Sequence, residues 1–252
     1  MQKLNQIYRK DYQGEDVVID RVYKDAKWNP TTEFISKSFS STPFSNRALV
    51  IGNGTSRLDF KLRLILEYKE ENSNSWKPAL STKRFSTYGC NAIYRDFRTD
   101  FLVATGDGII DEIADSGVCT NQIVYANNIK LLEYPGKFNL IPQNPQFNSG
   151  AIAAYLAAFD GHKKIYLLGF DGNDTPNYNY NVYAGTANYP DLNVTILEDF
   201  WVQSMATVMI SYPDTEFIRV APVKSFRTPE MWKYCLNFRT IDFYQFTQEA
   251  DV

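Results

Sequence analysis

The chain has 252 residues, 44% of them hydrophobic, and a formal net charge of −3. This length is enough to bury a full hydrophobic core, and the acidic balance argues against a general nucleic-acid-binding surface. Three cysteines without a CxxC pair indicate a reducing compartment, and no run approaches the roughly 18 apolar residues of a membrane span. Residues 1–13 lack the apolar segment of a signal peptide, so a cytoplasmic protein is expected.

Residues 1–45 are expected to form an N-terminal appendage that packs on a main domain spanning residues 46–252. Within the appendage, Asp16–Tyr23 is predicted to be an extended strand. The stretch from Trp28 to Pro43 is rich in Ser, Thr, Asn and Pro and is typical of a surface loop or linker.

From residue 47 onward, short apolar runs alternate with helical patterns. The predicted strands are 48–51, 84–88, 101–105, 122–125, 164–168 and, last in the chain, 216–220. The predicted helices are 58–70, 109–116, 149–159 and one that begins at Asp191 or Asn193 and ends at Met209. This alternation predicts an α/β fold with a mostly parallel sheet and helices on both faces.

The first predicted strand of the main domain ends in a glycine turn formed by Gly52, Asn53 and Gly54. Thr55 or Ser56 could cap a helix that follows this turn. Glycines allow backbone N–H groups to approach a phosphate, and a helix N-terminus adds partial positive charge. The turn therefore predicts a site for a nucleotide or another phosphorylated ligand, although it could equally be a plain strand–helix connection.

Polar residues follow four of the predicted strands: Asn53, Asn91, Asp107 and Asp171. Ligands of open parallel sheets bind beyond the carboxyl ends of the strands, close to the switch in strand order. We therefore expect these four side chains to share one site.

Three further segments bear on that site. Ser149 and Gly150 open an alanine-rich helix, where Ser149 could be the N-cap or part of a second phosphate or ribose site. The loop from about residue 172 to 192 is long and rich in Tyr and Asn, which suits a lid over a sugar. His162, the only histidine, is predicted to be a surface turn residue at the opposite edge of the sheet.

Two classes of site are not indicated. The acidic residues between Asp107 and Asp115 are typical of the solvent face of a short helix, so no metal site is predicted. No GxxxxGK[ST] segment is present, which excludes a standard P-loop kinase or ATPase.

Three segments, VIGNGTS, YGCNAIYRD and NSGAIAAYLAAFDGHKKIYLLGFDG, together resemble a known pattern over about residues 47–172. It is similar to that of the bacterial lipooligosaccharide sialyltransferases and the related motility-accessory and pterin-diphosphokinase-like (DUF115-type) proteins of one Rossmann-type superfamily. The resemblance implies a Rossmann-like fold in which these motifs surround a nucleotide.

The resemblance also implies roles for individual residues. The phosphates of the ligand would contact Gly52, Asn53, Gly54 and Ser56, and Asn91 would hydrogen-bond the donor. Ser149 and Gly150 would line the nucleotide pocket, and Gly169 and Asp171 would hold the base or ribose. Tyr183 or Tyr189 would support the leaving phosphate. The chain departs from the family at Thr55, where the family has proline, and in having no histidine base in the lid. Asp107 and Asp171 remain as candidate bases.

These patterns lead to the hypothesis of a glycosyltransferase-like enzyme that uses a nucleotide-sugar donor. One alternative is a pterin-type diphosphotransferase, which would require ATP and Mg²⁺. The other is a nucleotide-binding module without catalysis. The sugar, the base, the acceptor and the oligomeric state are not specified by the sequence.

Overall fold

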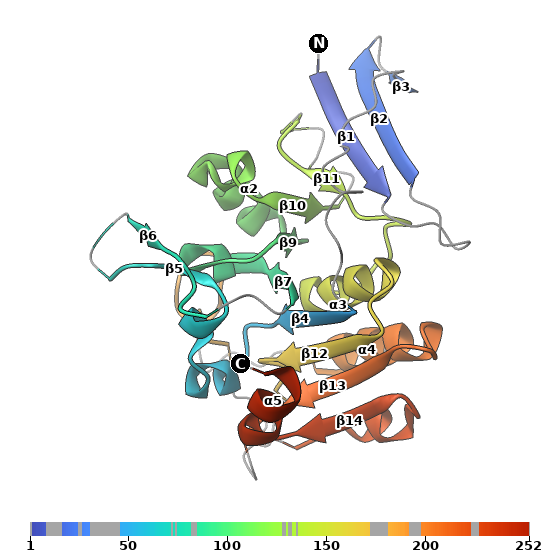
Figure 1. Cartoon of the computed structure of the whole chain (residues 1–252). Coiled ribbons are helices and arrows are strands. Elements are labelled where there is room, and N and C mark those ends of the chain that lie inside the picture. Colours follow the sequence, from blue (N-terminus) through green and yellow to red (C-terminus); the bar gives the residue numbers. More distant parts are fainter. Residues whose placement is uncertain are drawn as a thin grey trace.

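The structure is a computed structural model that describes residues 2–8, 17–24, 27–30, 46–71, 73, 75–81, 85–127, 130, 133–134, 136–171, 181–191, 198–222 and 227–251. Its main feature is a sheet with the strand order β14-β13-β12-β4-β7-β9-β10-β11-β1-β2-β3 (Figure 1). All neighbouring strands from β14 to β1 are parallel, and only β2 and β3 are antiparallel to their neighbours. This arrangement is the predicted α/β, Rossmann-like fold.

The strands of this sheet are β1 (Gln2–Tyr8), β2 (Val17–Lys24), β3 (Lys27–Pro30), β4 (Arg47–Ile51), β7 (Ser86–Cys90), β9 (Phe101–Ala104), β10 (Ile123–Ala126), β11 (Asn139–Leu140), β12 (Lys164–Leu168), β13 (Glu216–Val220) and β14 (Phe238–Ile241). A small second sheet contains β5 (Glu67–Lys69), β6 (Trp76–Lys77) and β8 (Phe97–Arg98).

The described α-helices are α2 (Asp107–Ser116), α3 (Ser149–Phe159), α4 (Glu198–Ser211) and α5 (Phe243–Ala250). Five 3-10 turns complete the described elements: η1 (Thr55–Asp59), η2 (Leu62–Leu64), η3 (Asn91–Arg95), η4 (Val118–Thr120) and η6 (Glu230–Tyr234).

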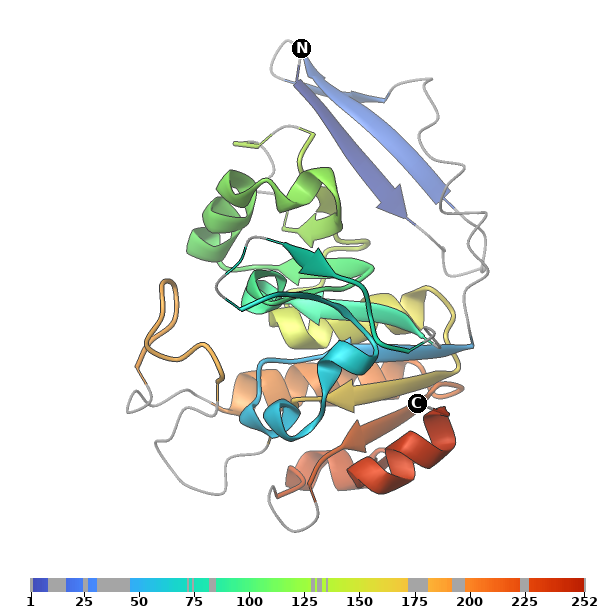
Figure 2. The same ribbon diagram turned by 60° about the vertical axis from the view of Figure 1, so that its left-hand side comes forward.

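Two hydrophobic cores lie on the two faces of the sheet. Along β4, Leu49 and Ile51 face one core, which also includes buried residues of α2 and α5. Ala48 and Val50 face the other, which includes α3 and α4. Figure 2 shows these two pairs of helices on opposite faces of the sheet. The alternation follows from the two-residue period of a strand, and it buries every residue of β4 from Ala48 to Ile51.

The strand order reverses direction next to β4. Following the chain, β7, β9 and β10 are added on one side of β4, whereas β12, β13 and β14 are added on the other. The switch point therefore lies between β4 and β12, and ligands of such sheets bind in the crevice beyond the carboxyl ends of the strands there.

Most predicted elements are confirmed, with small shifts at their ends. Helix 149–159 coincides with α3, helix 109–116 lies within α2, and Asp16–Tyr23 largely coincides with β2. Of the two predicted starts of the long helix, Asp191 is described and is not helical, and Asn193 lies outside the described residues; α4 is described from Glu198 and ends at Ser211, two residues beyond the predicted Met209. The appendage strand β1 pairs with β11 and so extends the sheet.

Two predictions about elements are wrong. The predicted helix 58–70 is replaced by η1, η2 and β5. Its apolar residues do not share one buried face, since Leu58 is 70% exposed while Leu62 and Ile65 are buried. Pairing of β5 with β6 and β8 outweighs the helical pattern. Strand 216–220 is not the last, since β14 and α5 follow; the capping box of Asp242 and Gln245 is a sequence signal for α5 that was missed.

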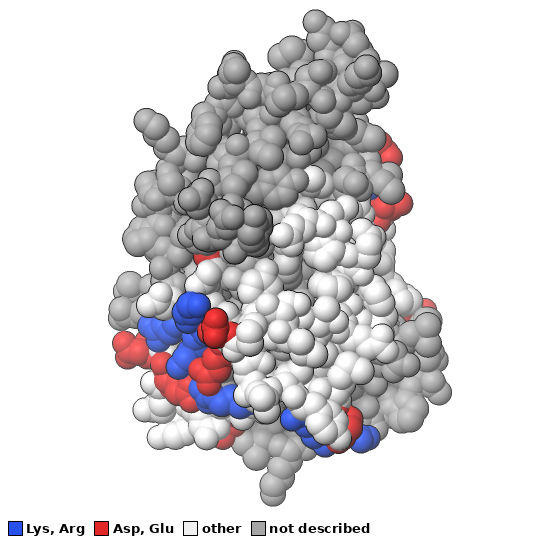
Figure 3. All heavy atoms as spheres, turned by 90° about the vertical axis from the view of Figure 1, so that its right-hand side faces the viewer, with Lys and Arg blue, Asp and Glu red and all other residues white. Residues whose placement is uncertain are grey.

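Charged side chains on the face drawn in Figure 3 gather in small mixed groups of both signs and leave a broad uncharged area above them. Over the described residues as a whole, opposite charges also pair, as Arg239 does with Glu216 and Glu249 and Lys233 with Glu230. Charges of both signs side by side do not form the single-sign field that attracts nucleic acid. No helix among the described residues is long and apolar enough to cross a bilayer.

Candidate functional site

The turns that follow β4 and β12 are joined to each other. The amide of Gly52 donates to the carbonyl of Leu168 (2.8 Å), and the amide of Gly54 donates to the carbonyl of Gly169 (2.9 Å). A β-carbon on Gly54 would lie 2.5 Å from Oδ2 of Asp171 and 2.6 Å from that same Gly169 carbonyl oxygen. Glycine is required here because two backbones approach closely. The two glycine amides expected to cradle a phosphate are thus bonded within the protein.

Asp171 is held by Ser56. Its Oδ2 accepts the Ser56 amide (2.8 Å), and its Oδ1 accepts the Ser56 hydroxyl. The side chain is buried, and this desolvation raises the pKa of Asp171 above its usual value, although the bonds from Ser56 oppose the shift. Both carboxylate oxygens are therefore used to anchor η1, and the residue is a poor candidate for a base that takes a substrate proton.

A buried arginine connects the glycine turn to the segment 181–191. Arg57 donates to the carbonyl of Gly52 (2.9 Å), to Oδ1 of Asn53 (3.1 Å) and to the hydroxyl of Tyr183 (2.8 Å). The Tyr183 hydroxyl in turn donates to Oδ2 of Asp96 (2.7 Å). Burial raises the pKa of Tyr183. Tyr183 therefore links a buried cation to a carboxylate, and its hydroxyl has both a donor and an acceptor partner inside the protein.

Asn91 is the first residue of η3, directly after β7, and Tyr189 of the segment 181–191 reaches the same place with its hydroxyl. Asn91 has a φ of 51°, in the left-handed region, and its Oδ1 is buried without a hydrogen-bond partner among the described residues. The hydroxyl of Tyr189 accepts the amide of the neighbouring Ala92 (3.2 Å). Burial raises the pKa of Tyr189, so it stays protonated at neutral pH. The amide oxygen of Asn91 and the hydroxyl proton of Tyr189 are thus groups that a ligand could engage.

The start of α3 differs in detail from the prediction. The N-cap is Asn148, whose Oδ1 accepts the Ala151 amide (2.8 Å), not Ser149. The hydroxyl of Ser149 is instead 2.7 Å from that of Thr105, which follows β9. A β-carbon on Gly150 would lie 3.3 Å from the ring of Phe170 in the turn after β12. Ser149 and Gly150 therefore adjoin the ends of two strands, as the hypothesis of a shared edge requires.

Asp107 is the first residue of α2, just beyond β9, and is exposed. It is followed by Gly108, where a β-carbon would lie 2.3 Å from Oδ1 of Asn188. Asp107 thus lies beside the segment that carries Tyr183 and Tyr189, and unlike Asp171 it is accessible to an acceptor.

His162 occupies the turn between α3 and β12, as expected, but it is only 1% exposed. Its Nε2 lies 3.1 Å from the hydroxyl of Tyr88, which also donates to Asp160. The prediction that His162 is a surface residue is wrong, because the hydroxyl of Tyr88 in β7 gives the buried imidazole a polar partner inside the core. The ring still belongs to the amino-terminal end of β12 and stays remote from the site at the other edge.

A separate cleft of about 1010 Å³ lies near the amino-terminal ends of β9 and β10, with Arg98, Asp100, Gln122 and Cys119 among its lining residues. None of the predicted site residues lines it. Among the described residues, no group of three or more His, Cys, Asp or Glu side chains could hold a metal ion.

Several residues of the candidate site were not predicted: Arg57, Arg95, Asp96, Glu112 and Asn188. Arg95 and Glu112 form an ion pair in which Nη2 and Oε2 are 2.6 Å apart, and Asn188 donates to the same Glu112 oxygen (2.7 Å). Their partners are far away in the sequence. A charged residue in a helical pattern carries no local signal that distinguishes such a role from a solvated face.

No protein-family model matches this chain, and no curated protein matches it. Among solved structures, one similar chain is the sialyltransferase CstII from Campylobacter jejuni in complex with the substrate analogue CMP-3FNeuAc, with 13% identity, 69% of this chain and 81% of that chain covered, and a TM-score of 0.44. Another is the monofunctional α-2,3-sialyltransferase Cst-I of the same organism, with 12% identity, 75% and 78% covered, and a TM-score of 0.42. Similarity at this level does not establish an activity for this chain.

Proposed function

We propose that this chain is a glycosyltransferase-like enzyme that transfers a sugar from a nucleotide-activated donor to an acceptor hydroxyl. The observation that carries the proposal is Asn91, which combines a left-handed backbone with a buried amide oxygen that no described residue bonds, at the carboxyl end of β7. A buried polar atom left unsatisfied by the protein is a place where a ligand can supply the missing partner. Asn91 would accept a hydrogen bond from the nucleotide donor.

Other groups at the same edge support the donor site. Tyr189 presents a hydroxyl proton next to Asn91, and the hydrogen bond between the hydroxyls of Thr105 and Ser149 uses only one of their two protons. Gly150 lets the ring of Phe170 pack closely against the start of α3. These groups come from β7, β9, α3 and the segment 181–191, on the β7 side of the switch point between β4 and β12.

The reaction would break the bond between the anomeric carbon of the sugar and a phosphate oxygen. The electron pair of that bond leaves with the phosphate, and the acceptor oxygen forms the new bond to the sugar. Tyr189 would donate a hydrogen bond to the charge that develops on the phosphate. Asp107 would take the acceptor proton, because Asp171 is already bonded through both oxygens to Ser56.

A second candidate is a nucleotide-binding module without catalysis. The engagement of Asp171 by Ser56 favours it, as does the burial of the only histidine at the opposite edge. In that case the protein binds nucleotide tightly and leaves every donor intact.

The test is a panel of nucleotides and nucleotide sugars, with and without Mg²⁺, measured by thermal unfolding. A ligand at 100 times its dissociation constant should add about 2.7 kcal/mol of stability. Glu133→Gln is the matched control, because the Glu133 carboxylate is exposed and pairs only with Lys130 among the described residues; it should respond like the parent. No stabilisation by any nucleotide would contradict both candidates.

Donor turnover then separates the two candidates. Release of free nucleotide from the stabilising donor is expected for the enzyme, and Asp107→Asn should lower it by roughly a hundredfold with little change in affinity. If the donor binds but no free nucleotide is released, the chain is the nucleotide-binding module without catalysis. Stabilisation by ATP only in the presence of Mg²⁺ would instead indicate the diphosphotransferase.

A further inference from the structure

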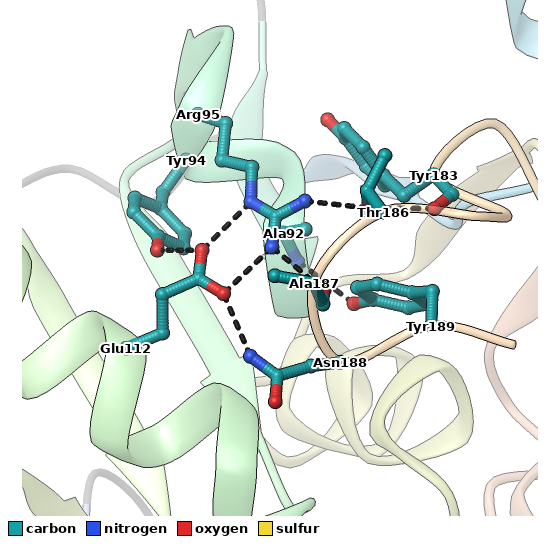
Figure 4. A network of polar contacts seen from close by, with 9 residues as sticks. All are labelled: Ala92, Tyr94, Arg95, Glu112, Tyr183, Thr186, Ala187, Asn188 and Tyr189. Carbon is teal, nitrogen blue, oxygen red and sulfur yellow. Dashed lines mark hydrogen bonds and ion pairs between the residues drawn. The ribbon is translucent and has the colours of Figure 1, made fainter.

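The carboxylate of Glu112 in α2 joins three parts of the structure (Figure 4). Its Oε1 accepts Nε of Arg95 (2.7 Å) and the hydroxyl of Tyr94, and its Oε2 accepts Nη2 of Arg95 (2.6 Å) and Nδ2 of Asn188 (2.7 Å). The pair is bidentate, and its side chains are only 22% and 26% exposed. The bonds from Arg95 lower the pKa of Glu112, so the ion pair persists at neutral pH.

Arg95 extends this network into the segment 181–191. Its Nη1 donates to the hydroxyl of Thr186 (2.8 Å), and its Nη2 donates to the carbonyl of Ala187 (3.0 Å). Its guanidinium also lies 5.5 Å from the ring centroid of Tyr183 and 5.7 Å from that of Tyr189. One arginine thus contacts the segment at four residues, and Glu112 fixes the orientation of that arginine.

The backbone of α2 is adapted to the same contact. Asn188 has a φ of 65°, and its side chain occupies the position that a β-carbon of residue 108 would take, 2.3 Å from its Oδ1. Glycine at this position removes the obstacle and lets Asn188 reach Glu112. The contact therefore depends on shape as well as on charge.

We propose that Glu112, Arg95 and Asn188 form a clasp that positions Tyr189 before any ligand binds, with Glu112 as its central positioning residue. The inference rests on the proposed function and refines it. A hydroxyl that stabilises a leaving phosphate must be held in place in advance, because ordering it during binding would weaken the interaction. The clasp holds the Tyr189 hydroxyl in position through contacts outside the donor site, and none of its three side chains needs to touch the donor.

The first measurement uses the ligand-free full chain. Hydrogen exchange of the amides of Thr186 and Tyr189 is compared in the parent, in Glu112→Gln and in Glu133→Gln as the matched control. Both amides donate within the segment, to Tyr183 and Thr186 respectively. Glu112→Gln should raise their exchange rates about tenfold or more, the scale of losing a charged hydrogen bond, whereas the control should not. Unchanged rates in Glu112→Gln would overturn the proposal.

Gly108→Ala tests the shape of the clasp without changing any charge. Alanine is the better helix former, so α2 itself should not loosen. The added methyl group displaces Asn188 from Glu112, and faster exchange at Thr186 and Tyr189 is expected. Gly106→Ala is the control, since its β-carbon would meet nothing closer than 3.6 Å. Equal exchange in Gly108→Ala and Gly106→Ala would argue against the clasp.

A double-mutant cycle asks whether the clasp acts through Tyr189. Affinity for the nucleotide or nucleotide sugar that stabilises the parent should fall about tenfold in Glu112→Gln. In a Tyr189→Phe background the same change should have little further effect, because the hydroxyl it positions is gone. Fully additive losses would show that Glu112 is structural only. If no nucleotide binds the parent, the proposed function fails, while the exchange measurements still decide whether the clasp orders the segment.

Discussion

The two sides of the carboxyl edge use their polar residues differently. Between β4 and β12, the glycine amides, Ser56 and Asp171 bond one another and leave no room for a side chain at residue 54. Beside β7, within the described part of the chain, the Asn91 oxygen accepts no hydrogen bond, and the Tyr189 hydroxyl accepts from Ala92 and keeps its own proton. The comparison indicates that the glycine-rich motif mainly builds the fold, whereas the less conspicuous Asn91 and Tyr189 are the better candidates for contact with a ligand.

The largest effect is expected for Gly54→Val. Its β-carbon would lie within 2.6 Å of both Asp171 and the Gly169 carbonyl, so the two turns must separate. The free energy of unfolding should fall by about 3 kcal/mol or more, at the upper end of overpacking effects. Gly106→Ala provides the control, and chemical denaturation provides the measurement. If Gly54→Val instead stays as stable as the parent and loses only its affinity for nucleotide, the turn binds phosphate as the sequence predicted.

Asp171→Asn comes next, because Asn replaces one acceptor oxygen with a donor facing Ser56. A loss of roughly 2–3 kcal/mol is expected, the scale of charged hydrogen bonds. The loss should depend on pH. Burial raises the folded pKa of Asp171, so the folded state binds its proton more tightly, and the parent loses stability as pH rises from the unfolded pKa near 3.8 through the folded pKa.

The stability difference between the parent and Asp171→Asn should therefore be larger near pH 3 than at pH 7. Denaturation of both proteins across this range measures it. A difference that grows with pH would mean that the bonds from Ser56 outweigh burial and that Asp171 is a stable anion.

The sequence predicted the sheet better than the site. Buried strands such as 164–168 and the helix 149–159 carry local patterns, whereas the prediction that the polar residues after the strands share a site stays a prediction. The partners of those residues could not be predicted, because Ser56 and Asp171 are 115 positions apart. Only the fold shows that both carboxylate oxygens of Asp171 are hydrogen-bonded to Ser56, and that no described residue donates a hydrogen bond to the amide oxygen of Asn91.

The two tyrosines of the segment 181–191 provide a third, smaller contrast. Tyr183→Phe removes a hydroxyl between Arg57 and Asp96 and should reduce stability by about 2 kcal/mol. Tyr189→Phe loses one bond from the Ala92 amide and should reduce stability by about 1 kcal/mol. Affinity for nucleotide should follow the opposite order. Equal losses of affinity in both variants would remove the distinction between a structural and a ligand-binding tyrosine.

The smallest change in stability is expected for Asn91→Gly. Glycine adopts a φ of 51° more easily than asparagine does, and the substitution removes a buried oxygen for which the described residues offer no partner. Against these gains stands the greater freedom of glycine in the unfolded chain, about 0.5–1 kcal/mol. The net free energy of unfolding should stay within about 1 kcal/mol of the parent, or rise.

Nucleotide affinity should nevertheless fall by about 1–3 kcal/mol, because the ligand loses its acceptor. Calorimetric titration and chemical denaturation of the same sample measure the two quantities separately. If instead Asn91→Gly lowers stability and leaves affinity intact, then Asn91 serves the fold as Asp171 does, and the two sides of the carboxyl edge are alike.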